Sequence, residues 1–240
     1  MMKTMVRDTV FFDLDGTLLP LDMDAFMESY MQKVEMLDDG HPGGVSQALL
    51  HQAFQYMMSD THPGVTNKAA FFGFIKEKAG VSESDLQDRL TVFYGHPFDT
   101  LKAFTRTEPI SADVVKTLKA KGYRLILATN PVFPRKVTDK RIAWAGLNQQ
   151  DFEYITAYEN ASSVKPHLSY YREILSNLGL KGEQCYMVGN SVKEDLCAAI
   201  LGFEVYLLTD YLIGNIDEAP ECEKGNYSDL KKWAEALPPV

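Results

Sequence analysis

Two aspartates stand two residues apart at the end of an apolar run near the start of the chain. The run 9–12 reads Thr-Val-Phe-Phe, Asp13 and Asp15 come after it, and Gly16 follows directly. Such a run is typical of a fully buried strand, and the glycine indicates a tight turn. Adjacent carboxylates at such a place are costly unless a cation or hydrogen bonds compensate them. The stretch therefore predicts either a functional site at the carboxyl end of a strand or, more simply, a solvated Asp-Gly turn.

Further polar residues follow apolar segments later in the chain. They are Thr129 and Asn130 after 123–128, Lys165 after 154–157, and Asn190 with Asp195 after 185–188. If these segments are parallel neighbouring strands, all of these side chains meet the first two aspartates at one edge of the sheet. That edge then holds acids, a lysine, a hydroxyl group and amides. Phosphoryl transfer requires such a set: a nucleophile, a proton donor, a hard cation and donors for the phosphoryl oxygens.

The elements that must position these residues alternate between strand and helix. Strands are expected at 9–12, 123–128, 154–157, 185–188 and 204–208, and helices at 111–121, 134–145, 169–177, 194–201 and 228–236. Alternation of this kind implies crossover connections and a parallel sheet that is covered on both faces. We therefore expect an α/β fold, a doubly wound parallel sheet, in which residues 1–20 join residues 105–240 to form one catalytic core.

The segment between the first strand and the rest of the core has a different pattern. Residues 21–104 contain no convincing strand, and their apolar residues recur at three- and four-residue spacing. Helices are expected at 22–37 and 46–58, from Thr66 or Asn67 to Gly80, and at 82–93. We expect this all-helical segment to be inserted into the core, with hinges near 18–21 and 97–106.

Composition disfavours several classes of function. The chain has 240 residues, of which 45% are hydrophobic and 24% charged, as in ordinary globular proteins. Its net charge of -9 disfavours a nucleic-acid or anionic-membrane partner. The first apolar run is cut by aspartates and no later run is long enough to span a bilayer, so we expect neither a signal peptide nor a membrane anchor. The three cysteines form no C-x-x-C pair, which favours a reducing, cytoplasmic location.

Taken in their order along the chain, the polar motifs resemble the four motifs of the haloacid dehalogenase (HAD) superfamily. The matching residues are Asp13-Leu14-Asp15-Gly16-Thr17, Thr129-Asn130, Lys165-Pro166, and Gly189-Asn190-Ser191 with Asp195. The resemblance covers the core at both ends of the chain, and the helical segment 21–104 lies where this family often places a cap. It implies a Rossmann-like core, a helical cap, and a phosphatase that acts on phosphate monoesters of a small metabolite.

The resemblance also implies a role for each residue. Asp13 is the expected nucleophile, whose carboxylate attacks phosphorus and gives an aspartyl-phosphate. Asp15 is the expected general acid, which protonates the leaving oxygen and then activates water. Thr129 and Asn130, with neighbouring backbone N–H groups, are expected to bind the transferring phosphoryl group. Lys165 is expected to offset the negative charge that the aspartates and the phosphate bring together.

The implied cofactor is Mg²⁺, bound by the Asp13 carboxylate, the Asp15 backbone carbonyl and the fourth motif. This sequence departs from the family at Asn190, which stands where the first acid of that motif usually lies. An amide oxygen still ligates Mg²⁺ but removes one negative charge. We therefore expect weaker magnesium binding, with Asp195 contributing more, directly or through water. Glu194 is a rival ligand.

Two other functions stay open. A phosphomutase needs the same nucleophile and acid, and differs in how the cap restrains water. The other is a non-catalytic protein that binds a phosphorylated ligand, and Asn190 is the single sequence feature that favours it. Dehalogenase and phosphonate-cleaving activities are disfavoured because Asp15 supplies a second acid. Neither the substrate nor the oligomeric state follows from the sequence, although several basic residues are candidates for reading a second anionic group: Lys33, Lys68, Lys76, Arg89, Lys102 and Arg106.

Overall fold

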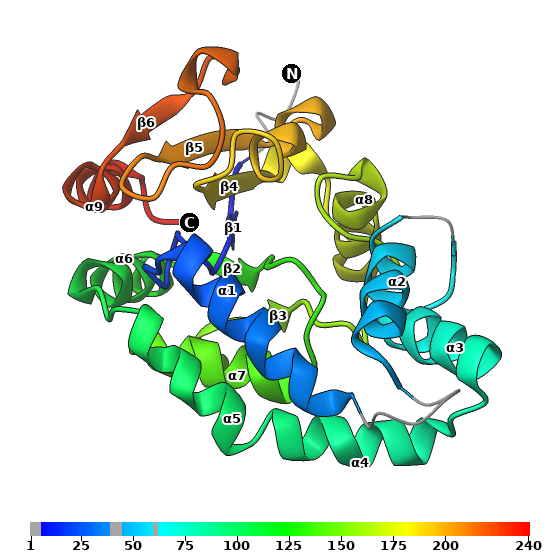
Figure 1. The fold of residues 1–240 in the computed structure, drawn as a ribbon. Helices are drawn as coiled ribbons and strands as arrows, with labels where there is room; N and C mark the ends of the chain where they lie inside the picture. The colour runs from blue at the N-terminus through cyan, green and yellow to red at the C-terminus, as the bar shows by residue number, and fades with distance from the viewer. Residues whose placement is uncertain (1–5, 39–44, 60–61) are drawn as a thin grey trace.

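A six-stranded, entirely parallel sheet forms the centre of the computed structural model (Figure 1), which describes residues 6–38, 45–59 and 62–240. Its strand order is β3-β2-β1-β4-β5-β6. The strands are β1 (Thr9–Phe12), β2 (Arg124–Leu127), β3 (Tyr154–Ile155), β4 (Cys185–Gly189), β5 (Glu204–Leu208) and β6 (Glu223–Gly225). The expected α/β fold is confirmed. β6 was not expected, because its Glu-Lys-Gly sequence carries no apolar residue.

The first strand lies in the middle of the sheet. β1 pairs with β2 on one side and with β4 on the other, and Phe12 stands opposite both Leu127 and Val188. All four residues of β1 are buried. Because parallel strands in this register end at the same level, the polar residues that follow them lie at one edge of the sheet.

Helices cover both faces of the sheet. The helix α6 (Pro109–Ala120) and the C-terminal helix α9 (Tyr227–Ala236) pack with Val10 and Phe12, whereas α8 (Leu168–Leu178) and the 3₁₀ helix η5 (Leu196–Leu201) pack with Phe11. Alternate residues of a strand point to opposite faces, so the apolar run of β1 supplies both cores at once. The helix α7 (Arg135–Trp144) follows β2, and the short 3₁₀ turns η3 (Gln149–Asp151), η4 (Gly182–Gln184) and η6 (Ile216–Glu218) complete the core.

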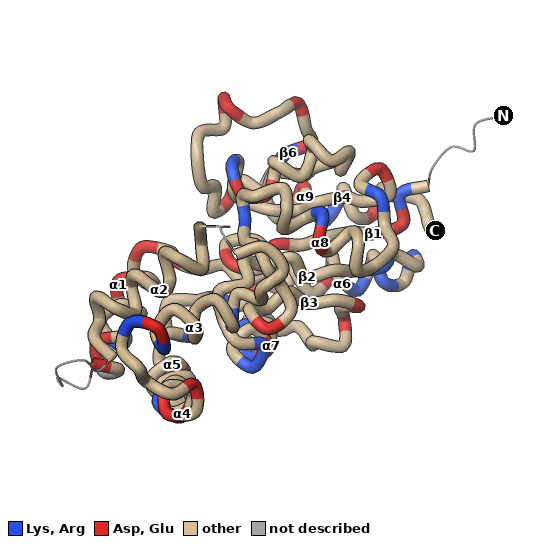
Figure 2. Tube along the Cα trace, turned by 90° about the vertical axis from the view of Figure 1, so that its right-hand side faces the viewer, with Lys and Arg blue, Asp and Glu red and all other residues tan. Residues whose placement is uncertain are grey.

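Between β1 and α6 the described residues form helices only. We call residues 21–104 the helical insert. Its elements are α1 (Met23–Val34), η1 (Glu35–Leu37), α2 (Gln47–Met58), α3 (Asn67–Ala79), α4 (Glu83–Phe93), α5 (His96–Asp99) and η2 (Thr100–Phe104). Its two ends lie side by side, because Leu21 pairs with Thr105 in an isolated antiparallel bridge. Seen from the side in Figure 2, helices α1–α5 lie at the opposite end of the molecule from the C-terminus.

Helix starts in the insert follow the sequence signals. Ser46, Thr66 and Ser82 each accept a hydrogen bond from the backbone N–H group three residues on. Two starts in the core differ from expectation by two residues, and the other three differ by one. The helix α6 begins at Pro109 rather than at residue 111, because proline suits the first turn and Glu108 caps it. The segment expected to be a helix at 194–201 is a 3₁₀ helix that starts only after Asp195.

Several buried or partly buried contacts hold the insert against the core. The Asn67 side chain is fully buried, and its Nδ2 donates to the backbone oxygens of Pro131 and Ser163, each at 3.1 Å. In a second contact between core and insert, Nζ of Lys140 in α7 donates to the carbonyl oxygen of Tyr94 at 2.9 Å. Within the described ranges, none of the helices combines the length and the apolar character needed to cross a bilayer.

The central position of β1 leads to a stability prediction. Phe12→Ala removes a fully buried ring and should lower the free energy of unfolding by about 3–5 kcal/mol. Urea titration followed by circular dichroism measures this change. In the control Val92→Ala, the side chain is 72% exposed, and the change should stay within about 0.5 kcal/mol. Equal effects of the two substitutions would contradict the central packing of β1.

Candidate active site

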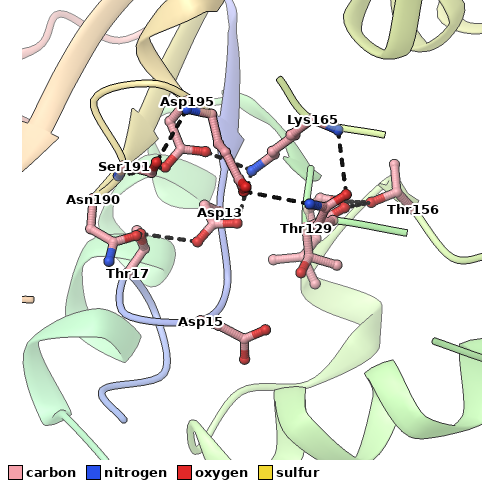
Figure 3. Close-up of polar contacts among 12 residues, drawn as sticks. Asp13, Asp15, Thr17, Thr129, Thr156, Lys165, Asn190, Ser191 and Asp195 are labelled. Carbon is pink, nitrogen blue, oxygen red and sulfur yellow. Dashed lines mark hydrogen bonds and ion pairs between the residues drawn. The ribbon is translucent and has the colours of Figure 1, made fainter. Parts of the chain in front are cut away.

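The residues expected to form the site come together at the carboxyl edge of the sheet (Figure 3). Asp13 follows β1 directly, and its backbone N–H donates to the Val188 carbonyl oxygen at 2.9 Å. The others stand at the ends of the neighbouring strands or in the loops that follow: Thr129 and Asn130 after β2, Lys165 after β3, and Asn190 and Asp195 after β4.

Lys165 lies between two of the aspartates. Its side chain is 1% exposed, and Nζ donates to Asp13 Oδ1 at 2.8 Å and to Asp195 Oδ1 at 2.6 Å. Burial alone lowers the pKa of Lys165, but the two carboxylates outweigh it and hold the pKa well above its usual value. The ammonium group therefore keeps its charge and joins the loop after β3 to residues that follow β1 and β4.

Asp195 is anchored through both of its oxygens. Oδ1 accepts from Lys165, and Oδ2 accepts from the Ser191 backbone N–H at 2.9 Å. Burial raises the pKa of Asp195 and the charge of Asp13 adds to the rise, while Lys165 opposes it. A Cβ atom on Gly189 would lie 2.2 Å from Asp195 Oδ2, so only glycine at the end of β4 lets this carboxylate approach the strand.

Asn190 turns its amide oxygen toward Asp13. The hydroxyl of Thr17 lies 3.1 Å from Asn190 Oδ1 and 3.3 Å from Asp13 Oδ2, so both oxygens face the same hydroxyl. The amide Nδ2 donates to the Tyr211 carbonyl oxygen, which fixes the orientation. Gly16 has φ +80°, and a Cβ there would lie 2.2 Å from Asn190 Nδ2. The turn after β1 thus needs glycine for both its backbone conformation and this close approach.

The loops of the second and third motifs are tied to each other. The Thr129 carbonyl oxygen accepts from the Thr156 hydroxyl at 2.6 Å and from the Tyr170 hydroxyl at 2.9 Å. The side-chain oxygen of Asn130 accepts from the Lys165 backbone N–H at 3.3 Å, and its Nδ2 donates to Glu194 Oε2 at 3.4 Å. Asn130 therefore positions the backbone of Lys165, and Glu194 is directed toward this amide.

Asp15 belongs to a second ion pair. Its Oδ2 accepts from Nη1 of Arg141, a residue of α7 whose side chain is 1% exposed. The Asp15 side chain itself is 23% exposed. Burial raises the pKa of Asp15 and the charge of Asp13 adds to the rise, while Arg141 opposes it. A raised pKa suits a carboxyl group that has to carry a proton.

Sequence reasoning missed Arg141. The available signal was an arginine on the apolar side of a predicted helix, since Arg141 shares the buried face of α7 with Val137 and Trp144. A basic residue among core positions requires a buried acid as its partner. The sequence pattern did not show which acid this was, because Asp15 lies 126 positions away in the chain.

A cleft of about 760 Å³ opens beside the site. Gly16 and Asn190 line it together with Tyr211, with Leu21 and Phe104 at the two ends of the insert, and with Arg106 just beyond the insert. Of the basic residues expected to read a second anionic group, Arg106 therefore lies next to the site. Lys68, by contrast, pairs with Glu83 at 3.4 Å within the insert.

With this geometry established, comparison with known proteins is informative. The model of the haloacid dehalogenase-like hydrolase family matches residues 7–201. The chain belongs to this family. Its sequence is 25% identical over 198 residues to a phosphoglycolate phosphatase of Colwellia psychrerythraea, covering 82% of each chain. It is 27% identical over 192 residues to a glyceraldehyde 3-phosphate phosphatase of Methanothermobacter thermautotrophicus, covering 79% of this chain and 80% of that one.

A solved structure shows the same fold. The crystal structure of a predicted phosphoglycolate phosphatase from Haemophilus somnus 129pt superposes with a TM-score of 0.60 at 21% identity, covering 97% of this chain and 99% of that one. These comparisons confirm the expected family and fold, and the names of the relatives agree with the expected phosphatase class.

The ion pairs of Lys165 lead to a prediction that needs no substrate. Lys165→Met leaves two buried carboxylates without their cation and should lower the free energy of unfolding by about 3–5 kcal/mol. Urea unfolding in a chelator measures the effect. Lys119→Met is the matched control, because it breaks an equally short 2.6 Å pair with Asp151 at the surface, where the expected loss is below about 1 kcal/mol. Equal losses in the free energy of unfolding would mean that the ion pairs of Lys165 stabilise the fold no more than a surface pair does.

Proposed function

We propose that this protein is a magnesium-dependent phosphatase that hydrolyses phosphate monoesters of a small metabolite through an aspartyl-phosphate on Asp13. The supporting observation is the placement of two carboxyl groups in different environments at one sheet edge. Asp13 is held by Lys165, and Asp15 is held by Arg141 with a raised pKa. A nucleophile and a separate proton donor are what ester cleavage at phosphorus requires.

In this proposal Asp13 is the nucleophile. Lys165 donates to Oδ1 of Asp13, and the Thr17 hydroxyl lies 3.3 Å from Oδ2 of the same carboxylate. The carboxylate attacks phosphorus, the bond from phosphorus to the ester oxygen breaks, and Asp15 gives its proton to that oxygen. Asp15, now ionised, takes a proton from the water that attacks the aspartyl-phosphate, which releases inorganic phosphate and restores Asp13. Thr129, Asn130 and Lys165 would bind or neutralise the phosphoryl oxygens.

The oxygen donors around Asp13 fit a magnesium ion. Mg²⁺ takes oxygen ligands, and Asp13 Oδ2 and Asn190 Oδ1 both face the Thr17 hydroxyl. We assign these two oxygens and the Asp15 carbonyl as ligands. Asp195 was expected to contribute to the metal directly or through water, but both of its oxygens accept hydrogen bonds, from Lys165 and from the Ser191 N–H, so we assign it instead as the anchor of Lys165. In the described ranges no three His, Cys, Asp or Glu side chains gather for a metal. The ion would neutralise charge on the phosphoryl group.

The helical insert would act as a cap that closes over the sheet edge and selects the leaving group. Its contact with the core through Asn67 is made to Pro131 and Ser163, in the loops that carry Thr129 and Lys165. The relatives are named for phosphoglycolate and glyceraldehyde 3-phosphate, both small phosphate esters. We therefore propose a small phosphorylated metabolite as the substrate class.

Replacement of the nucleophile tests the mechanism. Asp13→Asn should lower kcat for p-nitrophenyl phosphate with Mg²⁺ by at least about a thousandfold, and should abolish acid-stable labelling of the protein by ³²P-substrate. The control Asp113→Asn removes a surface carboxylate that pairs with Lys231 and should leave both readouts unchanged. An Asp13→Asn protein as active as the parent would rule out the aspartyl-phosphate.

Product analysis separates the alternatives. Release of inorganic phosphate from sugar phosphates supports the phosphatase, whereas formation of an isomer indicates a phosphomutase. A wild-type protein that binds phosphate esters but hydrolyses none of them with Mg²⁺, from acid to neutral pH, would be a binding protein.

The amide at position 190 gives a separate prediction about the metal. Asn190→Asp adds a negative charge to the proposed ligand set and should tighten Mg²⁺ binding by roughly tenfold or more. Isothermal titration of the substrate-free protein measures this affinity. Asn148→Asp adds the same charge at the start of η3, outside the site, and should leave the affinity unchanged. If both variants bound Mg²⁺ with higher affinity than the wild type, or if neither did, the assignment of Asn190 as a magnesium ligand would be refuted.

A further inference from the structure

Arg141 is a fully buried cation with one edge that none of the described residues satisfies. Its side chain is 1% exposed, and Nη1 pairs with Asp15. The other two nitrogens, Nε and Nη2, are buried and have no hydrogen-bond partner within residues 6–38, 45–59 and 62–240. Buried donors without partners are rare in folded proteins, so two on one side chain call for an explanation. Across the described residues, Asp15 is the only acid that forms an ion pair with Arg141.

The two unpartnered nitrogens form a complete binding edge. Nε and Nη2 of a guanidinium group present parallel N–H donors, whose spacing matches the two oxygens of a carboxylate. The same edge is in use elsewhere in this protein. At the surface, Arg124 donates from Nε to Glu153 Oε2 at 2.8 Å and from Nη2 to Oε1 at 2.6 Å. Arg141 thus keeps open the edge with which Arg124 binds a carboxylate.

This open edge lies where the core meets the helical insert. The guanidinium carbon of Arg141 is 4.6 Å from the centre of the Phe133 ring. From the insert, the rings of Tyr30 and Tyr94 lie against the same Phe133 ring, with centroids 5.6 Å and 6.4 Å from its centre. Burial raises the pKa of Tyr30 to about 12 and the pKa of Tyr94 well above its usual value, and in both cases Arg141 opposes the rise. A ligand of Arg141 would therefore lie between the sheet edge and the insert, on the side of Asp15.

We propose that Arg141 binds a carboxylate on the leaving group, so that the preferred substrates are phosphate esters of small hydroxy acids. Asp15 contacts Arg141 and, in the proposed reaction, also the ester oxygen, so the carboxylate stands one or two carbons from that oxygen. This inference rests on the proposed phosphatase function and adds the substrate class. It makes Arg141 a specificity-determining residue, distinct from the groups that bind the phosphoryl oxygens.

The test compares an acid substrate with its neutral isostere. Wild-type protein, Arg141→Met and Arg141→Lys are assayed with Mg²⁺ on 2-phosphoglycolate, on 2-phosphoglycolamide and on p-nitrophenyl phosphate. The wild type should prefer the acid over the amide by about 10- to 100-fold in kcat/KM, the range expected for charge-assisted hydrogen bonds. Arg141→Met should bring this ratio close to one. Arg141→Lys keeps the charge but lacks the two-donor edge, so its ratio should lie between the two.

A ratio is used because loss of Arg141 also disturbs Asp15 and lowers the rate with every ester. Arg124→Met is the matched control, since it removes the same edge from the Glu153 pair at the surface and should keep the wild-type ratio. Should Arg141→Met fail to fold, Arg141→Lys carries the test.

Each remaining outcome decides against the inference. A wild-type ratio near one, together with turnover of p-nitrophenyl phosphate, overturns the carboxylate site but keeps the phosphatase. A ratio unchanged in both Arg141 variants overturns it as well. A wild-type protein that hydrolyses none of the three esters overturns the phosphatase function and the inference together.

Discussion

The ammonium group of Lys165 is the interaction on which the site depends. It lies between the carboxylates of Asp13 and Asp195 and is almost completely buried. Two acids at the end of a buried strand repel each other, and neither can be solvated freely there. A single cation that contacts both makes it possible for them to stay charged. Because Asp13 and Asp195 follow two paired strands and Lys165 lies in the loop after a third, the same contacts also fix the relative positions of these segments.

The two buried cations of the site divide its charge into separate regions. Lys165 serves Asp13 and Asp195, whereas Arg141 serves Asp15 and lies next to the helical insert. Burial raises the pKa of Asp15 despite the arginine. Two aspartates that are only two positions apart therefore have different electrostatic surroundings. Such a difference between neighbouring titratable groups is the general way in which one site provides both a nucleophile and an acid.

Sequence reasoning reached the parts of the fold that local patterns encode. The apolar runs of β1 and β4 and the polar residues after them predicted one sheet edge, and the apolar spacing with its flanking polar residues predicted helix starts near Ser46, Thr66 and Ser82, where the structure has hydroxyl caps. The strand β6 was missed because it carries no apolar pattern. Arg141 was missed because its function depends on a partner from the other end of the core. Patterns within one element cannot show which buried charges meet across two elements.

The position of β1 affects how the chain assembles during translation. Thr9–Phe12 is synthesised before both strands that flank it, Arg124–Leu127 and Cys185–Gly189, which follow more than a hundred residues later. During translation β1 is thus an apolar strand without its neighbours while the residues of the insert are being made. Pairing at such long sequence separation is slow, and an exposed apolar strand is prone to aggregate. The pairing of β1 with β2 and β4 is therefore the step that removes this apolar strand from exposure to other chains.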